Sequence, residues 1–201
     1  ATVCPTRRIG SASHERLEPR WGAHTLMRYD FTIPTLETER LILRGWKESD
    51  ADGVTEIYGD EDTAHFIGGY ETPENCWRIV CQRIGQWSIR GYSMFAIEET
   101  ASGDFIGYCG PHFPVGWPER EIVWSLIKRY HGRGYATEAA HASLRFAYET
   151  LGWETAMSLV DAMNTPSAKV AMRLGAKYER TAKVTNFTAD VYRHSPPSTF
   201  L

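Results

Sequence analysis

The segment Arg129 to Ala140, which reads RYHGRGYATEAA, constrains the fold more than any other part of the chain. It joins a strand-like apolar run, Ile122 to Ile127, to a stretch in which apolar residues recur every three or four positions. Gly132 and Gly134 carry no Cβ, so backbone N–H groups lie uncovered where a helix begins and its dipole is positive. Such a turn is a binding site for a polyanion such as a diphosphate. A tight turn that needs glycine only for its geometry is the alternative, and it stays open here.

Two familiar phosphate-binding loops do not fit this segment. A P-loop reads GxxxxGK[ST], and no lysine follows these glycines. A dinucleotide-binding fingerprint reads GxGxxG, whereas Thr137 stands where its third glycine should be, and the chain offers only one clear βαβ-like unit. The pattern therefore indicates another kind of strand-to-helix anion site.

Length and composition predict an ordinary globular protein. The 201 residues suffice for one domain with a full core, and 42% of them are hydrophobic and 23% charged. No apolar run approaches the length of a membrane span. A net charge of −3 gives no overall attraction to nucleic acid, so we expect no nucleic-acid or membrane partner. An anionic ligand must be held by local geometry.

The cysteines and the N-terminus indicate where this protein works. Four cysteines show neither CxxC spacing nor a matching HxxxH, so we predict no metal site and free thiols in a reducing compartment, the cytoplasm: Cys4, Cys76, Cys81 and Cys109. Residues 1–28 hold five arginines and two acids without hydrophobic periodicity, which predicts an N-terminal tail before a domain at 29–201. Arg7-Arg8 precedes no apolar stretch, so no secretory signal is predicted.

From residue 36 the predicted elements follow one another regularly. Within Leu36–Arg44 a compact strand is expected at Leu41–Leu43. Further strands are expected at Ser93–Glu98, Asp104–Cys109, Glu121–Lys128, Ala156–Val160, Ala176–Glu179 and Ala189–Tyr192, with a loop at Pro111–Pro118. Helices are expected at Glu48–Tyr58, Thr72–Gly91, Ala136–Leu151 and Asn164–Leu174. Hairpins with one clear crossover predict an α/β (α+β) fold. Its central sheet is mixed and mostly antiparallel, with about six or seven strands and helices on both faces.

This order of elements carries five short motifs that resemble the GNAT superfamily of N-acetyltransferases. The resemblance is closer to its RimJ/RimL-like branch, which modifies ribosomal-protein N-termini, and it covers residues 37–193. The motifs are Thr38-Glu39-Arg40-Leu41-Ile42-Leu43-Arg44, Phe105-Ile106-Gly107, Glu121-Ile122-Val123-Trp124, the glycine segment itself, and Asn164-Thr165-Pro166-Ser167 with Leu174-Gly175-Ala176. Val123 and Ala176 depart from the glycine and phenylalanine usual in the branch, which concerns the substrate pocket rather than the diphosphate loop.

The resemblance implies a site for acetyl-coenzyme A as co-substrate. The diphosphate would rest on backbone amides between Arg129 and Thr137, and the strand before them would splay from its neighbour to hold the pantetheine arm. A backbone N–H close to Leu126 would polarise the thioester carbonyl. Arg133 either adds charge at the rim or is simply solvated. The implied cofactor-binding residues are Leu126, Ile127, Arg129, His131, Gly132, Arg133, Gly134, Tyr135, Ala136, Thr137 and Asn164.

Three residues have competing interpretations. Glu121 is the candidate general base, and the alternative is a solvated acid at a strand edge. Ser167 is the candidate proton donor to the leaving thiolate, and the alternative is a helix-terminus serine bonded to backbone. Asn164 matches the asparagine that contacts the cofactor and is also a good N-cap. In the Pro/Gly-rich loop, Phe113 and Trp117 are expected to line the acceptor groove.

The sequence thus predicts an acetyl-coenzyme A-dependent N-acetyltransferase that attacks the thioester directly with a primary amine. The acceptor would be a protein N-terminus or a small-molecule amine, and the enzyme a monomer or homodimer. A non-catalytic acyl-coenzyme A binding or sensing module, and a nucleotide-binding module, remain as alternatives. The fold itself does not choose the amine.

Overall fold

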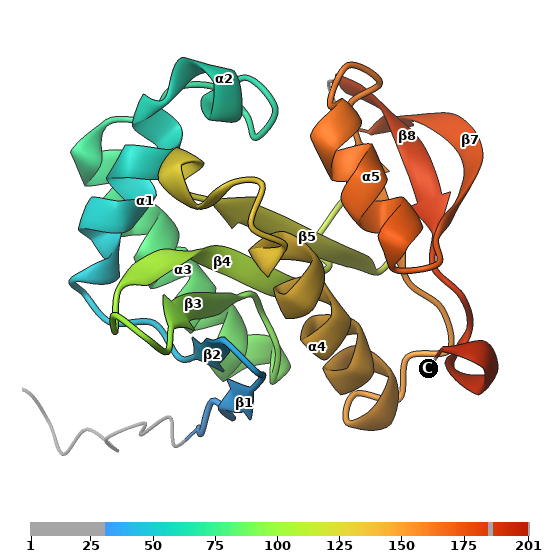
Figure 1. Ribbon diagram of the computed structural model, residues 1–201, viewed down its shortest axis with the longest axis horizontal. Coiled ribbons are helices and arrows are strands. Elements are labelled where there is room, and N and C mark those ends of the chain that lie inside the picture. Colours follow the sequence, from blue (N-terminus) through green and yellow to red (C-terminus); the bar gives the residue numbers. More distant parts are fainter. Residues whose placement is uncertain (1–30, 185–186, 201) are drawn as a thin grey trace, which may run out of the picture.

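The computed structural model describes residues 31–184 and 187–200, so the predicted tail at 1–28 lies outside the described residues. The domain boundary at residue 29 stays a prediction. The described strands form one eight-stranded sheet in the order β1-β2-β3-β4-β5-β6-β8-β7 (Figure 1). The strands are β1 Leu36–Glu37, β2 Leu41–Arg44, β3 Phe95–Glu99, β4 Phe105–His112, β5 Glu121–Leu126, β6 Met157–Val160, β7 Lys177–Val184 and β8 Phe187–Arg193.

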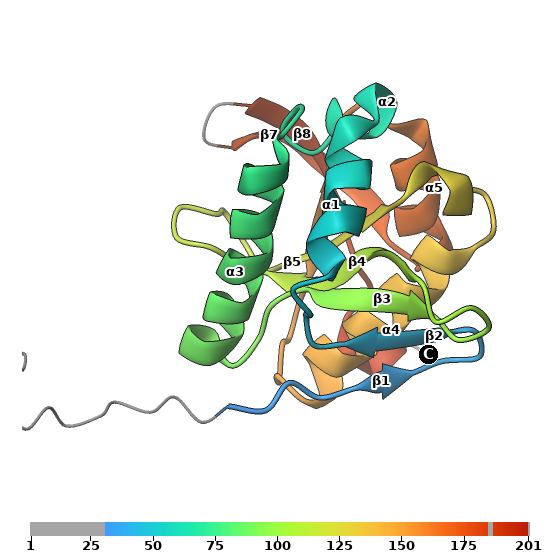
Figure 2. The same cartoon turned by 90° about the vertical axis from the view of Figure 1, so that its left-hand side faces the viewer.

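Only the central pair, β5 and β6, is parallel among these strands; all other neighbours run antiparallel. The predicted mixed, mostly antiparallel sheet is confirmed, with eight strands rather than six or seven. Helices cover both faces, as Figures 1 and 2 show: α1 packs with α3 on one side, and α4 packs on β4 and β5 from the other. The helices are α1 Asp50–Gly59, α2 Glu61–Ala64, α3 Pro73–Arg90, α4 Tyr135–Glu149 and α5 Thr165–Arg173.

The predicted limits of α3 are confirmed by its caps. Thr72 accepts a hydrogen bond from the backbone N–H of Asn75 at 3.4 Å, and Pro73 occupies the first turn, where a missing N–H costs nothing. Gly91 ends the helix in the left-handed conformation, with φ of 73°. Helix ends of this kind can be predicted from the sequence because the capping residues lie directly next to the helix.

Within Leu36–Arg44, the compact strand expected at Leu41–Leu43 is confirmed as β2, and a further short strand, β1, pairs antiparallel with it. One local prediction was wrong. The loop expected from Pro111 begins later, because Pro111 lies inside β4. Proline has no backbone N–H, but none is needed at this position. Pro111 turns its backbone nitrogen away from β5 toward the side of β3, and β3 pairs with β4 only as far as Cys109. The short helix α2 was missed altogether.

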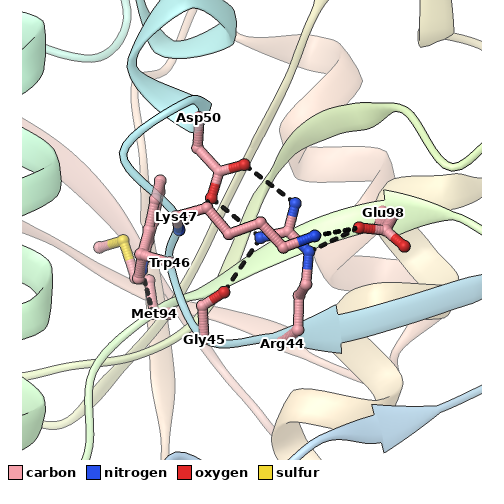
Figure 3. A network of polar contacts seen from close by, with 7 residues as sticks. All are labelled: Arg44, Gly45, Trp46, Lys47, Asp50, Met94 and Glu98. Carbon is pink, nitrogen blue, oxygen red and sulfur yellow. Dashed lines mark hydrogen bonds and ion pairs between the residues drawn. The ribbon is translucent and has the colours of Figure 1, made fainter.

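A buried ion-pair cluster fixes the start of α1 against the sheet (Figure 3). The guanidinium of Arg44 donates to both carboxylate oxygens of Asp50 at 2.9 Å and to Glu98 at 2.6 Å. Arg44, with Lys47, holds the pKa of Glu98 below its ordinary value. Asp50 is fully buried at the first turn of α1, and the two other residues belong to β2 and β3. The cluster thereby sets the direction of the α1–α2 segment, whose end borders the site described next.

Candidate active site

The sheet opens between β5 and β6. These strands meet at one matched pair, Glu121 opposite Met157, and beyond it β5 pairs only with β4. The backbone N–H of Ile127 donates to the carbonyl of Ile106 on the β4 side at 2.9 Å. Because successive residues of a strand turn their backbone N–H and C=O groups to opposite sides, those of Leu126 face the gap between β5 and β6. The splay that the resemblance implied is confirmed.

Two side chains replace the missing ladder bonds across the gap. The carboxylate of Glu121 accepts a 2.8 Å hydrogen bond from the backbone N–H of Leu159 in β6. In the other direction, the hydroxyl of Ser158 donates to the carbonyl of Ile122 in β5 at 2.7 Å and lies 2.9 Å from His194 Nε2. The opening is therefore held at a fixed width by buried side chains.

The glycine loop presents uncovered amides, as its sequence predicted. Gly132 and Gly134 have φ of 75° and 85°, in the left-handed region. Gly134 is the N-cap of α4 and makes no side-chain capping bond. Within the described part of the chain, no hydrogen bond satisfies the backbone N–H groups of residues 132–137; the first bonded amide is that of Glu138, to Gly134 O at 3.1 Å. Six consecutive donors at a positive helix end favour an anion.

These amides border a hollow of about 510 Å³, which we call the cofactor hollow. It runs between the parted end of β5, the glycine loop and the first turns of α5. Eight of the eleven predicted cofactor residues line it: Leu126, His131, Gly132, Gly134, Tyr135, Ala136, Thr137 and Asn164. His131 also ties the loop to the strand, because its Nε2 lies 2.9 Å from the carbonyl oxygen of Leu126.

The other three predicted cofactor residues do not line the cofactor hollow. Ile127 is buried in the core. Arg129 forms an ion pair with Glu56 on α1. Arg133 borders a separate shallow groove, and its guanidinium lies 5.4 Å from the ring centre of Tyr130. Contacts of these side chains with the cofactor therefore have no geometric support.

Besides Lys128, which pairs with Asp60 and Asp62, the cofactor hollow is lined by two cations that sequence reasoning missed, Lys169 and Arg173. They lie four residues apart on α5, so they share one face of that helix. Neither makes an ion pair within residues 31–184 and 187–200. The spacing, on a helix that begins beside the gap, was a signal that could have identified them.

A brace behind the glycine loop was also missed. The Oε1 atom of Glu138, in the first turn of α4, accepts from the hydroxyl of Thr38 at 2.7 Å and from the backbone N–H of Arg40 at 2.9 Å. The side chain of Arg40 then donates to Glu138 Oε2 at 2.7 Å and to the carbonyl of Arg133 at 3.0 Å. The first hairpin thus holds the glycine loop in place.

A second hollow, of about 500 Å³, meets the first at the gap, and we call it the acceptor hollow. Both are lined by Phe66, Ile67, Trp124, Asn164 and Ser167. The acceptor hollow extends past Glu121 and Trp117 toward β4 and α3. Trp117 lines it as expected, whereas Phe113 does not.

Glu121 lines the acceptor hollow and is only 4% exposed, so its interpretation as a solvated edge acid was wrong. Its second oxygen accepts a 2.6 Å bond from the indole N–H of Trp117. Burial raises the pKa of Glu121 to about 7, although the bonds from Leu159 and Trp117 oppose the rise. Each carboxylate oxygen keeps a free lone pair, so the group can accept a proton near neutral pH.

Asn164 and Ser167 sit together at the start of α5. Asn164 Oδ1 accepts from the backbone N–H of Ser167 at 3.1 Å, which confirms the N-cap interpretation. Asn164 and Ser167 also border both hollows, so capping leaves them available to a ligand. Contacts of Asn164 with the cofactor and of Ser167 with a leaving group stay predictions.

Among the described residues, no three histidine, cysteine or acidic side chains are grouped so that they could hold a metal ion. Nor is any helix in this part of the chain both long and apolar enough to cross a membrane.

Comparison with known proteins agrees with this geometry. Residues 40–177 match the family described as the acetyltransferase (GNAT) domain. An acetyltransferase of Agrobacterium tumefaciens str. C58 of known crystal structure is 32% identical with a TM-score of 0.75, over 84% of this chain and 98% of that one. The uncharacterized N-acetyltransferase p20 of Bacillus licheniformis is 28% identical over 150 residues, which are 73% of this chain and 84% of p20.

A more distant structure shares the fold alone. RimL, a ribosomal L7/L12 alpha-N-protein acetyltransferase solved in complex with coenzyme A, is 18% identical with a TM-score of 0.65, over 80% of this chain and 97% of RimL. The match to the family spans well over half of the chain. The chain therefore belongs to the GNAT family of acetyltransferases and is an N-acetyltransferase with acetyl-coenzyme A as co-substrate.

Proposed function

We propose that this enzyme transfers the acetyl group of acetyl-coenzyme A to a primary amine, by direct attack of the amine on the thioester. One observation carries the proposal. The cofactor hollow and the acceptor hollow meet beside an opened pair of strands, and the buried carboxylate of Glu121, with a pKa of about 7, lines the acceptor hollow. A base poised near the working pH is what abstraction of an amine proton requires.

The cofactor hollow supplies a place for each part of the co-substrate. The diphosphate binds the uncovered amides of residues 132–137, and Lys169 and Arg173 add positive charge beside it. The pantetheine arm follows the parted edge of β5, where unpaired backbone groups replace the missing strand. The backbone N–H of Leu126 then donates to the thioester oxygen as negative charge develops there.

The chemistry needs little more than proton transfer. An α-amino group costs only about 1 kcal/mol to deprotonate at pH 7, whereas a lysine costs about 4 to 5 kcal/mol. Glu121, directly or through one water, takes the amine proton as the new C–N bond forms at the carbonyl carbon. The tetrahedral intermediate collapses with loss of the thiolate, and the hydroxyl of Ser167 supplies or relays the proton that thiolate accepts.

A thiol-release assay against an amine panel tests the proposal, with coenzyme A binding measured separately. We expect turnover with at least one primary amine. Glu121→Gln should bind coenzyme A as the native enzyme does and lower kcat about 100-fold or more. The limb of the kcat/KM profile that rises near pH 7 should disappear in this variant, leaving the limb set by the amine.

Two results would contradict the proposal. Tight coenzyme A binding without turnover on any amine would indicate a sensing module instead. Unchanged kcat in Glu121→Gln would remove Glu121 as the base. The variant Glu119→Gln, which alters an acid two residues away that pairs with Arg180, serves as the matched control.

A further inference from the structure

Arg83 is a buried cation without a partner. It lies on α3, is only 9% exposed and lines the acceptor hollow. Its guanidinium makes no hydrogen bond or ion pair within the described residues, although every other buried charged side chain there is bonded. The guanidinium nitrogens of Arg83 keep accessible surface in this hollow, so a ligand bound there can accept their hydrogen bonds.

The surroundings of Arg83 contain a second unsatisfied group. The Nδ1 atom of His112 is buried and has no hydrogen-bond partner, and His112 lines the same hollow. Burial, with the nearby charges of Arg83 and Arg90, lowers the pKa of His112 to about 3, so this imidazole is neutral at pH 7. A neutral imidazole can donate one N–H bond beside the guanidinium.

The acceptor hollow is lined by both positively and negatively charged side chains. Among the described residues, Arg83 is the one arginine or lysine that lines it, whereas Glu121 and Asp161 supply carboxylates. His112 lies directly opposite Glu121 in the pairing of β4 with β5, so one of the two unpartnered donors neighbours the proposed base, and Arg83 reaches the same hollow from α3. A small ligand with one anionic and one amino group would fit both ends of this arrangement.

We propose that the acceptor amine carries a carboxylate, which binds the guanidinium of Arg83 and the imidazole of His112 while the amine faces Glu121. The proposal rests on the function proposed above and names its substrate class. A carboxylate is favoured over a phosphate because a single guanidinium matches its single charge and its two oxygens.

Matched acceptors test this without any mutation. The probes are β-alanine, 4-aminobutyrate, 6-aminohexanoate and dipeptide amides that begin with aspartate or glutamate, each compared with its carboxamide counterpart. We expect kcat/KM to favour the best carboxylate about 10- to 100-fold over its carboxamide. Equal rates for both members of every pair would overturn the proposal while leaving the acetyl transfer itself intact.

Variants of Arg83 then assign the preference. Arg83→Met should remove the preference for the carboxylate. Arg83→Lys should keep part of this preference, because lysine retains the positive charge but cannot donate to both carboxylate oxygens as the planar guanidinium does. Turnover of the carboxamides should change less than about threefold in both variants. Arg78→Met, at an exposed position of the same helix, is the matched control and should leave the preference unchanged.

Calorimetric titration of the best carboxylate separates this proposal from the catalytic one. The native enzyme should bind the carboxylate at least about tenfold more tightly than Arg83→Met does, whether or not thiol is released. Equal affinities would exclude Arg83 as the carboxylate site. Absence of thiol release with intact carboxylate binding would instead contradict the proposed function alone.

Discussion

At the scale of the residue, Glu121 shows most clearly how burial produces function. Its pKa is raised from 4.5 to about 7, so the folded enzyme holds a proton at pH values where the unfolded chain has lost it. Unfolding therefore releases a proton in this window, and rising pH favours the unfolded state. The burial that raises this pKa therefore makes the fold less stable as the pH rises.

This cost predicts a measurable dependence of stability on pH. Between pH 4.5 and 7, the free energy of unfolding of the native enzyme should fall relative to Glu121→Gln by on the order of 3 kcal/mol. Chemical denaturation of both proteins across this window measures the difference, in which the contributions of other groups cancel. A difference that stays constant with pH would mean that Glu121 titrates at its ordinary value.

Gly132 allows loop binding to be separated from loop stability. It is left-handed with open space where a Cβ would lie, and Gly152, with φ of 64°, has the same properties after α4. Alanine at either position should cost about 1 to 2 kcal/mol of stability. Only Gly132→Ala should also weaken coenzyme A binding, by about tenfold. The strain at residue 132 would change the direction of the backbone N–H groups in the loop, so that they no longer point at the diphosphate. Equal affinities of both variants for coenzyme A would show that this loop does not bind the cofactor.

At the scale of the element, the first hairpin positions the glycine loop through Glu138. Glu138→Gln removes the ion pair with Arg40, whose side chain also holds the carbonyl of Arg133. We expect coenzyme A to bind about three- to tenfold more weakly, with the fold retained, because partly exposed pairs contribute little to stability. Glu149→Gln, at the exposed far end of α4, is the control. Fluorescence or calorimetric titration measures both, and identical affinities would show that the brace has no part in binding.

The same elements show what sequence reasoning can reach. The glycine loop, the caps of α3 and the N-cap Asn164 were predictable because each signal and its consequence lie within a few residues. The brace was not, since Arg40 and Glu138 stand 98 positions apart. The carboxylate of Glu121 was identified as a base candidate, but its burial depends on Trp117 and on a backbone group of β6.

At the scale of the whole molecule, the opened sheet makes one continuous site from two hollows. The α1–α2 segment borders both, as do β5 and the start of α5, so three parts of the chain far apart in sequence enclose the junction. The carboxylate site proposed at Arg83 could not be predicted from the sequence. As one position on an amphipathic helix, Arg83 resembles any surface arginine, and only the packing of α3 on the sheet buries it.

Binding of the co-substrate diphosphate by the amides of residues 132–137 is the step on which the proposed reaction depends. Nuclear magnetic resonance of the ¹⁵N-labelled enzyme during titration with coenzyme A tests this binding most directly. We expect large downfield shifts for these amide protons, and no such shifts when pantetheine without the nucleotide diphosphate is added instead. Saturation with coenzyme A that leaves these amides unshifted, while signals elsewhere move, would contradict it.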